Sequence, residues 1–267
     1  MQSYKLIADL FDFMNDGSDE SLNFIKDVSK NHSCPVVRHE AVYCLSEIPS
    51  SESIKFLKKL ADEDESYVVK HEALVTLGTI GGTDEIPFLE KFTMDEIPEI
   101  VDSEKIGIQR IIDDFDYENE VVKNPEKFIV ELKDFSSEKL NRRIQIIFQF
   151  MILGAKGNRD ATDAVYFSLA NDPSTIVRHE AGYVLGEIGN EYAVELMGKA
   201  LEKEKSPIVI HETLFALGTT GRKSALPIIE RFLDADDYIV SESAQIGFDR
   251  ITKLQNPYSG VRSFERR

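Results

Sequence analysis

Four histidine–glutamate pairs recur at regular intervals in this 267-residue sequence. They are His39-Glu40, His71-Glu72, His179-Glu180 and His211-Glu212. The step from the first pair to the second equals the step from the third to the fourth, 32 residues, and one offset of 140 residues maps the first two pairs onto the last two. Imidazole and carboxylate together are ligands for iron, zinc or manganese. The spacing therefore predicts a metal centre shared between two related halves.

The segments around these pairs read alike, which indicates an internal repeat. They are VVRHEAVYCLSEI at 36–48, VVKHEALVTLGTI at 68–80, IVRHEAGYVLGEI at 176–188 and IVIHETLFALGTT at 208–220. Each is followed by a turn and a second amphipathic run, so the unit is helix-turn-helix, and stacked units of this kind form an α-solenoid. We therefore predict an all-α fold, a solenoid of eight HEAT-like helical pairs in two symmetric halves of four.

The two halves are predicted to be separated by a linker. The predicted boundaries are 1–115 for the N-terminal half, 116–137 for the linker, 138–254 for the C-terminal half and 255–267 for a tail that is basic at its end. The linker segment is charged, interrupts the repeat and contains Asn124-Pro125. Two degenerate repeats, at 106–111 and 246–251, match each other at the same offset and lack a His-Glu pair. Repeats that close a solenoid are expected to differ in this way.

The histidines lie opposite the apolar packing stripe of their helices. At about 100° per residue, Ala41 falls within roughly 80° of Val37, whereas His39 falls at about 200° from it. The other three segments give the same result, so two facing half-solenoids would bring all four histidines into one cleft. Tyr43 and Tyr183 share the histidine face and would either hydrogen-bond a ligand or simply form the cleft wall. A plainer interpretation is that the His-Glu pairs are solvent-exposed residues copied when the repeat was duplicated. That interpretation must explain why all four repeats have His-Glu while neighbouring positions differ between repeats.

Composition narrows the possible partners and location. The chain has 48 acidic and 31 basic residues, a formal charge of −17. Such a surface repels nucleic-acid phosphates and favours a cationic partner or substrate, although it also serves solubility. Of the two cysteines, Cys34 and Cys44, neither belongs to a CxxC motif, and Cys44 is predicted to be a buried free thiol. With neither a secretory signal nor a membrane-length apolar stretch, we expect no membrane association and a cytoplasmic location.

The repeated motifs VRHEA-x-Y-x-L, KHEA-x-x-x-LG, VRHEAGYVLGEIG and HE-x-x-x-ALG resemble those of deoxyhypusine hydroxylases. Members of that family are HEAT-repeat, dinuclear-iron monooxygenases that complete hypusine on translation initiation factor 5A. The resemblance covers nearly the whole chain, from the first repeat to the closing repeat near Ile251. Four His-Glu motifs in two pairs on a HEAT array are highly specific for this family, whereas a single VRxEAxxLG motif is not.

The resemblance implies a role for each pair. The implied metal ligands are His39, His71, Glu72, His179, His211 and Glu212. The remaining glutamates, Glu40 and Glu180, would bind the ammonium groups of the substrate. The implied cofactors are two iron ions (Fe²⁺) with O2 as co-substrate, and the implied partner is the deoxyhypusine-containing translation factor. One chain carries both halves, so a monomer is sufficient. The spacing by itself indicates only four equivalent pairs.

Three positions depart from the family pattern and leave alternatives open. Four residues after the second and fourth histidines the family usually has Glu, whereas this chain has Val75 and Phe215, and Ile210 replaces a basic residue. An apolar wall accommodates a cation less well, which favours a HEAT-repeat di-iron oxygenase with a different substrate. A metal-free protein-binding scaffold is a further alternative, because solenoids offer recognition surfaces. A zinc hydrolase fits less well, since catalytic zinc usually takes three protein ligands.

Overall fold

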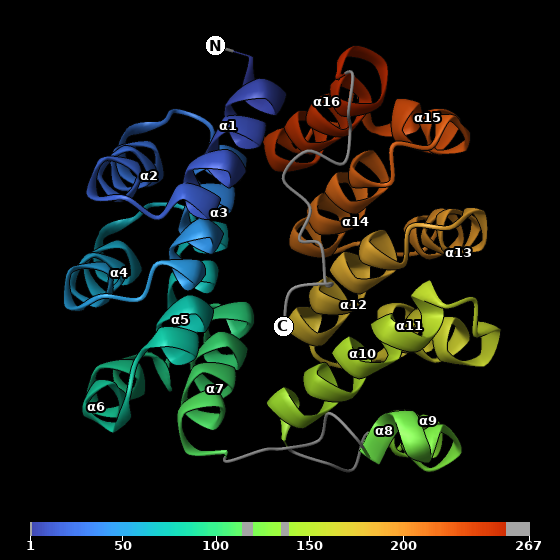
Figure 1. Ribbon diagram of the computed structural model, residues 1–267, viewed down its shortest axis with the longest axis horizontal. Coiled ribbons are helices and arrows are strands. Elements are labelled where there is room, and N and C mark those ends of the chain that lie inside the picture. Colours follow the sequence, from blue (N-terminus) through green and yellow to red (C-terminus); the bar gives the residue numbers. More distant parts are fainter. Residues whose placement is uncertain (1, 114–119, 135–138, 255–267) are drawn as a thin grey trace.

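The computed structural model describes residues 2–113, 120–134 and 139–254, and these form only helices, turns and connecting loops. The predicted all-α solenoid is confirmed. Two rows of helices face each other, with α1 to α7 in one row and α10 to α16 in the other (Figure 1). None of the helices among the described residues combines the length and apolar character that a membrane-spanning helix needs.

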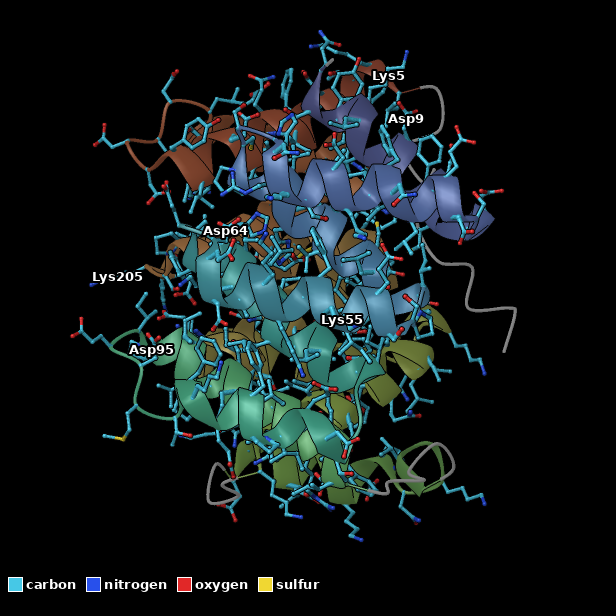
Figure 2. All side chains as sticks on the ribbon, turned by 90° about the vertical axis from the view of Figure 1, so that its left-hand side faces the viewer. Lys5, Asp9, Lys55, Asp64, Asp95 and Lys205 are labelled. Atoms are coloured by element: carbon cyan, nitrogen blue, oxygen red, sulfur yellow. The ribbon has the colours of Figure 1, made fainter. Side chains whose placement is uncertain are left out.

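The first half places four helices toward its partner half and three on the outside. The inner helices are α1 (Ser3–Asp16), α3 (Pro35–Cys44), α5 (Tyr67–Ile80) and α7 (Pro98–Ile112). The outer helices are α2 (Asp19–Asn31), α4 (Ser51–Glu63) and α6 (Ile86–Leu89). Short 3-10 turns extend α3 at Leu45–Glu47 and flank α6 at Thr83–Glu85 and Glu90–Phe92. Figure 2 looks onto this half, whose surface carries charged side chains such as Lys55 and Asp95.

The second half repeats this arrangement. Its inner helices are α10 (Leu140–Ala155), α12 (Thr175–Ile188), α14 (Pro207–Thr219) and α16 (Tyr238–Lys253). Its outer helices are α11 (Arg159–Asn171), α13 (Glu191–Leu201) and α15 (Leu226–Ile229), with 3-10 turns at Lys223–Ala225 and Glu230–Phe232. In both halves, three helical pairs are followed by one further inner helix, α7 or α16. That helix is the part of the fourth repeat that the described residues contain.

The segment between the halves contains two helices, α8 (Glu120–Lys123) and α9 (Pro125–Lys133). Helix α9 packs against α10 and α11 and so extends the outer row of the second half. The predicted boundaries at 115 and 138 lie within the undescribed residues 114–119 and 135–138, and the tail at 255–267 is also outside the described residues. The domain limits therefore stay predictions.

Local sequence signals set where the helices begin. Outer helices α2, α4, α11 and α13 each have a side-chain cap that accepts a hydrogen bond from the main chain of the first turn. These caps are Ser18, Ser50, Asn158 and Asn190. Inner helices α3, α7 and α14 instead begin with Pro35, Pro98 and Pro207, whose fixed φ suits the first helical position.

The two rows join at both ends and so enclose the space between them. Helix α1 contacts α16, where Ser3 Oγ donates to Glu242 Oε1 at 2.9 Å. Helix α7 contacts α10, where the main-chain N–H of Asn141 donates to Gln109 Oε1, also at 2.9 Å. The inner helices of the two halves therefore face one common interior.

Candidate metal centre

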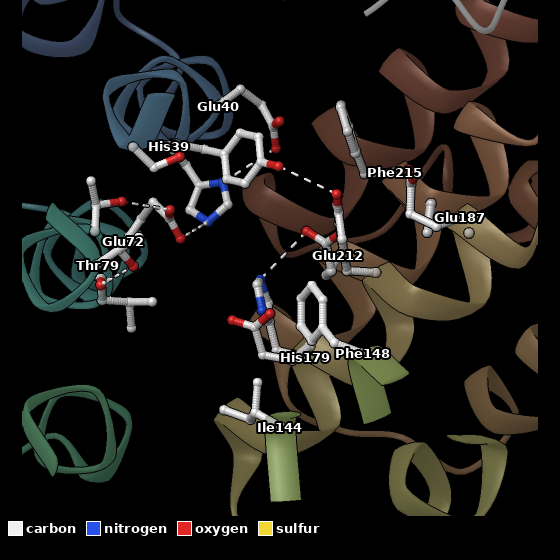
Figure 3. Close-up of a pocket in the computed structure, with 18 of the residues that line it drawn as sticks. His39, Glu40, Glu72, Thr79, Ile144, Phe148, His179, Glu187, Glu212 and Phe215 are labelled. Carbon is white, nitrogen blue, oxygen red and sulfur yellow. Dashed lines mark hydrogen bonds and ion pairs between the residues drawn. The ribbon is translucent and has the colours of Figure 1, made fainter. Parts of the chain in front are cut away.

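The four repeated histidines meet in that interior. They come from α3, α5, α12 and α14, and none is more than 4% exposed. Across the two halves, the ring centroids of His39 and His211 are 5.0 Å apart, as are those of His71 and His179. In Figure 3, His39 lies on one side of the cavity and His179 on the other. One cluster therefore contains all four imidazoles.

Each of these imidazoles has a buried Nε2 atom to which no described residue hydrogen-bonds. A buried polar atom without a partner costs free energy, and such atoms call for an explanation. The Nε2 atom is also a common point of metal attachment for histidine. Four such atoms directed into one cluster fit bound metal ions, and this observation does not depend on any relative of the chain.

Two serines that the sequence reasoning missed orient the second and fourth histidines. Ser103 Oγ lies 2.8 Å from His71 Nδ1, and Ser243 Oγ lies 2.8 Å from His211 Nδ1. Each hydroxyl donates its proton to a main-chain carbonyl at 2.6 Å, so it can only accept from the histidine. The proton is therefore on Nδ1, and the Nε2 lone pair faces the cluster. The 32-residue period could have found these serines, because they follow His71 and His211 by one repeat.

Each half adds a carboxylate to its two imidazoles. Glu72 Oε2 lies 3.6 Å from His39 Nε2 and 3.8 Å from His71 Nε2. In the second half, Glu212 Oε2 lies 3.4 Å from His179 Nε2, and the ligand atoms of these two residues and His211 all lie within 4.8 Å of one another. Two histidines and one carboxylate form the set that binds non-haem iron in many oxygenases. The structure thus brings the six predicted ligands into one cluster, in which possible metal-binding groups also cross between the halves, as for His39, His71 and His179.

The other two repeated glutamates lie beside the cluster. Glu40 and Glu180 are buried and line the same cavity. Glu40 Oε1 is 3.2 Å from His39 Nδ1, so it also contacts one of the predicted ligands. Both carboxylates are therefore placed to bind a ligand in the cavity, and Glu40 also contacts a histidine.

Burial shifts the protonation of the histidines toward the metal-binding form. It lowers the pKa of His71, His179 and His211 well below the ordinary value, and positive charge on neighbouring side chains acts in the same direction. Burial also lowers the pKa of His39, but the hydrogen bond with Glu40 and the nearby carboxylates outweigh it and raise the pKa overall. Three of the four imidazoles are therefore neutral at pH 7, as metal ligation requires.

The buried carboxylates of the cluster lie close together, and neighbouring positive side chains do not balance their negative charge. Burial raises the pKa of Glu72 to about 7, although His39 and Thr76 oppose the shift. The pKa of Glu212 is raised well above its ordinary value by burial and then by the charges of the neighbouring glutamates. Carboxylates in such surroundings gain from a nearby cation. The electrostatics of the cluster therefore favour bound divalent ions.

A cavity of about 510 Å³ adjoins the cluster, and its lining includes apolar and aromatic side chains. Val75 and Phe215 both line it. Tyr43 and Tyr183, from opposite halves, lie with their hydroxyl oxygens 3.3 Å apart. The sequence reasoning missed several other lining residues, three of which lie inside repeated segments but outside the His-Glu pairs. They include Arg110, Asn141, Gln145, Gln149, Glu187 and Arg250.

The residues outside the pattern behave as ordinary structural groups. Cys44 is a buried thiol outside any disulfide, as predicted, and Cys34 is buried and outside any disulfide as well. His32 follows the last residue of α2 and accepts a hydrogen bond from the main chain of Cys34 at 3.1 Å. None of these three residues lines the cavity.

Comparisons with known proteins agree with the architecture. The sequence profile of HEAT repeats matches residues 22–104 and 162–247. A comparison with curated protein sequences finds no match. Human deoxyhypusine hydroxylase, solved in complex with glycerol, is similar with a TM-score of 0.78 and 24% identity, over 91% of this chain and 88% of that chain. This likeness shows a shared fold.

Two further solved structures are much less similar. One is the YibA protein of Escherichia coli, with a TM-score of 0.34 and 16% identity, over 94% of this chain and 96% of that one. The other is the CpcE–CpcF complex of phycocyanin lyase from Nostoc, with a TM-score of 0.31 and 14% identity, over 85% and 93%. Scores this low carry no argument about this chain.

Proposed function

We propose, from the premise that this chain belongs to the HEAT-repeat family, that it is a di-iron, O2-dependent monooxygenase. Its proposed reaction is hydroxylation of the deoxyhypusine side chain of translation initiation factor 5A to hypusine. The proposal depends on one observation: four buried histidine Nε2 atoms without a hydrogen-bond partner cluster with two carboxylates, on the fold of human deoxyhypusine hydroxylase. A cytoplasmic location and a sufficient monomer are parts of the same proposal.

Two equivalent ligand sets would hold the iron ions. One set is His39, His71 and Glu72, and the other is His179, His211 and Glu212. Bound ferrous ions supply the redox chemistry with O2 that hydroxylation of an unactivated C–H bond requires, which acid–base side chains do not provide. Ser103 and Ser243 hold two of the imidazoles in the tautomer that this binding needs.

The rest of the cavity would bind and orient the substrate. Deoxyhypusine carries amines separated by methylene groups, so it needs both anionic and apolar contacts. Glu40 and Glu180 would bind its ammonium groups, since both are buried and line the cavity. The apolar surfaces of Val75 and Phe215 would pack against the methylene groups between them. The tyrosine pair at the cavity wall would limit the access of water.

The leading alternative keeps the metal and changes the substrate. Val75 and Phe215 make part of the wall apolar, and Arg250 lies over the Phe215 ring at 5.2 Å. A cation in this part of the cavity would meet a positive side chain, which favours a less cationic substrate. A metal-free scaffold and a zinc hydrolase would both lack iron-dependent oxygen incorporation.

The test is a direct assay with reconstituted protein. The chain is loaded anaerobically with Fe²⁺ and then given O2 and a deoxyhypusine-containing translation factor, and mass spectrometry follows the addition of one oxygen atom. The proposal expects iron-dependent addition at the deoxyhypusine residue. Bound iron that consumes O2 without modifying this substrate would favour the alternative substrate, and a protein that binds no iron would favour the scaffold.

The assigned role of Glu40 is tested by Glu40→Gln. The loss of one charged contact with an ammonium group should raise KM by about tenfold or more, while iron content stays at the wild-type level. Glu63→Gln on α4 is the matched control, because Glu63 is exposed and does not line the cavity. Loss of iron in the Glu40 variant would instead make Glu40 a metal ligand.

A further inference from the structure

The cavity contains a row of neutral amide side chains that the metal centre does not use. Every Asn or Gln that lines it belongs to α10: Asn141, Gln145 and Gln149. Residues four apart on a helix lie on the same face, so these side chains form one line along the helix. Phe148 and Ile144 of α10 line the cavity next to this amide row. One stripe of uncharged amides therefore runs along α10 beside these two apolar side chains.

All three amides have a buried atom that no described residue satisfies. The atoms are Asn141 Nδ2, Gln145 Oε1 and Gln149 Oε1. Asn141 is only 1% exposed, and its main-chain N–H is held by Gln109 of the first half. Each unpartnered buried amide costs free energy, and three in a row along a cavity wall indicate a ligand that supplies the missing partners.

The amide row breaks the internal symmetry of the chain. The offset of 140 residues maps Gln145 onto Lys5 and Gln149 onto Asp9 of α1. Neither of these two residues lines the cavity. The predicted metal ligands are present in both halves. The cluster alone therefore cannot determine in which of its two chain directions a substrate peptide binds across it. The amide row is present in one half only and would therefore set a direction.

The spacing and chemistry of the row match an extended peptide. Successive amides are four residues apart on α10, about 6 Å along the axis. Alternate residues of an extended chain are about 6.6 Å apart. A carboxamide both donates and accepts hydrogen bonds, as a peptide group does, and it carries no charge that would select a side chain. The row therefore suits main-chain groups rather than an ion.

We propose that the amide row of Asn141, Gln145 and Gln149 binds the main chain of an extended peptide segment of the protein substrate. This inference rests on the proposed function, in which the modified residue is part of a protein and its side chain reaches the metal centre. The row holds the segment that carries this residue along α10 and fixes its direction. Free modified amino acid has no such segment and does not use the row.

The test compares a peptide with the free amino acid. The double variant Gln145→Leu/Gln149→Leu keeps side-chain size but removes both amides, and Gln245→Leu is the control, because Gln245 is exposed and bonds only Asp249 among the described residues. Binding is measured for a fluorescent peptide with one central deoxyhypusine residue and, by displacement of a small-molecule probe, for free deoxyhypusine. The double variant should bind the peptide about tenfold more weakly. Its affinity for the free amino acid should not change.

A second arm changes the peptide instead of the protein. N-methylation of alternate peptide groups should weaken binding to the wild-type chain and have little further effect on the double variant. Equal peptide affinity in the wild type and the double variant, or equal losses for peptide and free amino acid, overturns the amide row. So does a wild-type chain that binds no peptide.

The two proposals fail separately. If peptide binding depends on the amide row but no hydroxylation follows, the row is supported and the proposed reaction is rejected. If the double variant hydroxylates the substrate as well as the wild type does, the reaction is supported and the row is rejected. Circular dichroism of each variant establishes that the helical content is unchanged.

Discussion

At the residue scale, the chemistry depends on which ring nitrogen of each histidine carries the proton. Ser103 and Ser243 settle this for His71 and His211, because each hydroxyl already donates to a main-chain carbonyl. The sequence predicted the histidines from their repetition, but it did not predict these serines. A serine in the sequence does not by itself indicate a contact with a histidine. The contact follows only from the stacking of repeats, which places each serine against a histidine of the preceding inner helix.

The serine contact gives a prediction about metal affinity. Ser103→Ala should weaken binding at the set containing His71 by about tenfold or more, since loss of the group that orients a ligand typically has this effect. The set containing His211 should keep its affinity. Competition titration with a metal chelator measures both steps. Ser29→Ala is the control, because Ser29 bonds a carbonyl of its own helix in the same way but is not hydrogen-bonded to a histidine of the cluster. Unchanged affinity in the Ser103 variant would show that the serine only stabilises its helix.

Glu72 gives a prediction about pH. Its pKa is about 7 in the folded metal-free chain, against an ordinary value of 4.5. Between these values the folded state binds more protons than the unfolded state, so this residue lowers the unfolding free energy as pH rises from 4.5 to 7. Glu72→Gln removes this loss. The variant should therefore gain stability relative to the wild type across this range, by on the order of 3 kcal/mol, and the difference should stay constant above it.

Urea unfolding of the metal-free proteins between pH 5 and pH 8 measures this difference. Added Fe²⁺ or Zn²⁺ should reverse the ranking, because the wild-type carboxylate then has a cation beside it. A constant difference across the pH range would mean that Glu72 is already ionised in the metal-free fold.

At the scale of elements, close helix packing keeps the serines against the histidines. Gly78 of α5 meets Gly107 of α7, and an added Cβ on Gly78 would lie 2.3 Å from the Cα of Gly107. Gly218 and Gly247 make the equivalent contact between α14 and α16, where the distance would be 2.4 Å. Close helix packing therefore explains why both closing repeats have glycine in their Ile-Gly motif.

The packing gives a prediction about stability and metal binding together. Gly78→Ala should force α5 and α7 apart and lower the unfolding free energy by about 1–3 kcal/mol. It should also weaken metal binding, because Ser103 is on α7 and His71 is on α5. Gly82→Ala is the control, since a Cβ there meets nothing within 4 Å. A variant as stable as the wild type would contradict the close contact.

The sequence predicted the strongly patterned elements and missed the weak ones. The four His-Glu helices and their outer partners follow from the repeat and its caps. Helices α8 and α9 fall in the segment that was interpreted as a linker, because α9 depends on packing against α11 and carries no repeat signal. The amide row of α10 was missed for a similar reason, since it has no counterpart in the first half.

At the scale of the whole molecule, duplication places the same ligands on two facing surfaces. Contacts of α1 with α16 and of α7 with α10 bring these surfaces together, and neither half has all four histidines. The five glutamates that line the cavity outnumber its two arginines, so ionisation of the glutamates favours cations in the interior. The facing arrangement could be expected from the helical wheel, whereas the side-chain contacts between the halves could not.

The central claim is that this interior holds two iron ions. The most direct measurement is the metal content of the purified chain after anaerobic reconstitution with Fe²⁺, for the wild type and for His71→Ala. We expect close to two irons per wild-type chain, and a clear loss in the variant with helical content unchanged. Wild-type protein without bound iron, or a variant that retains both ions, would contradict the account.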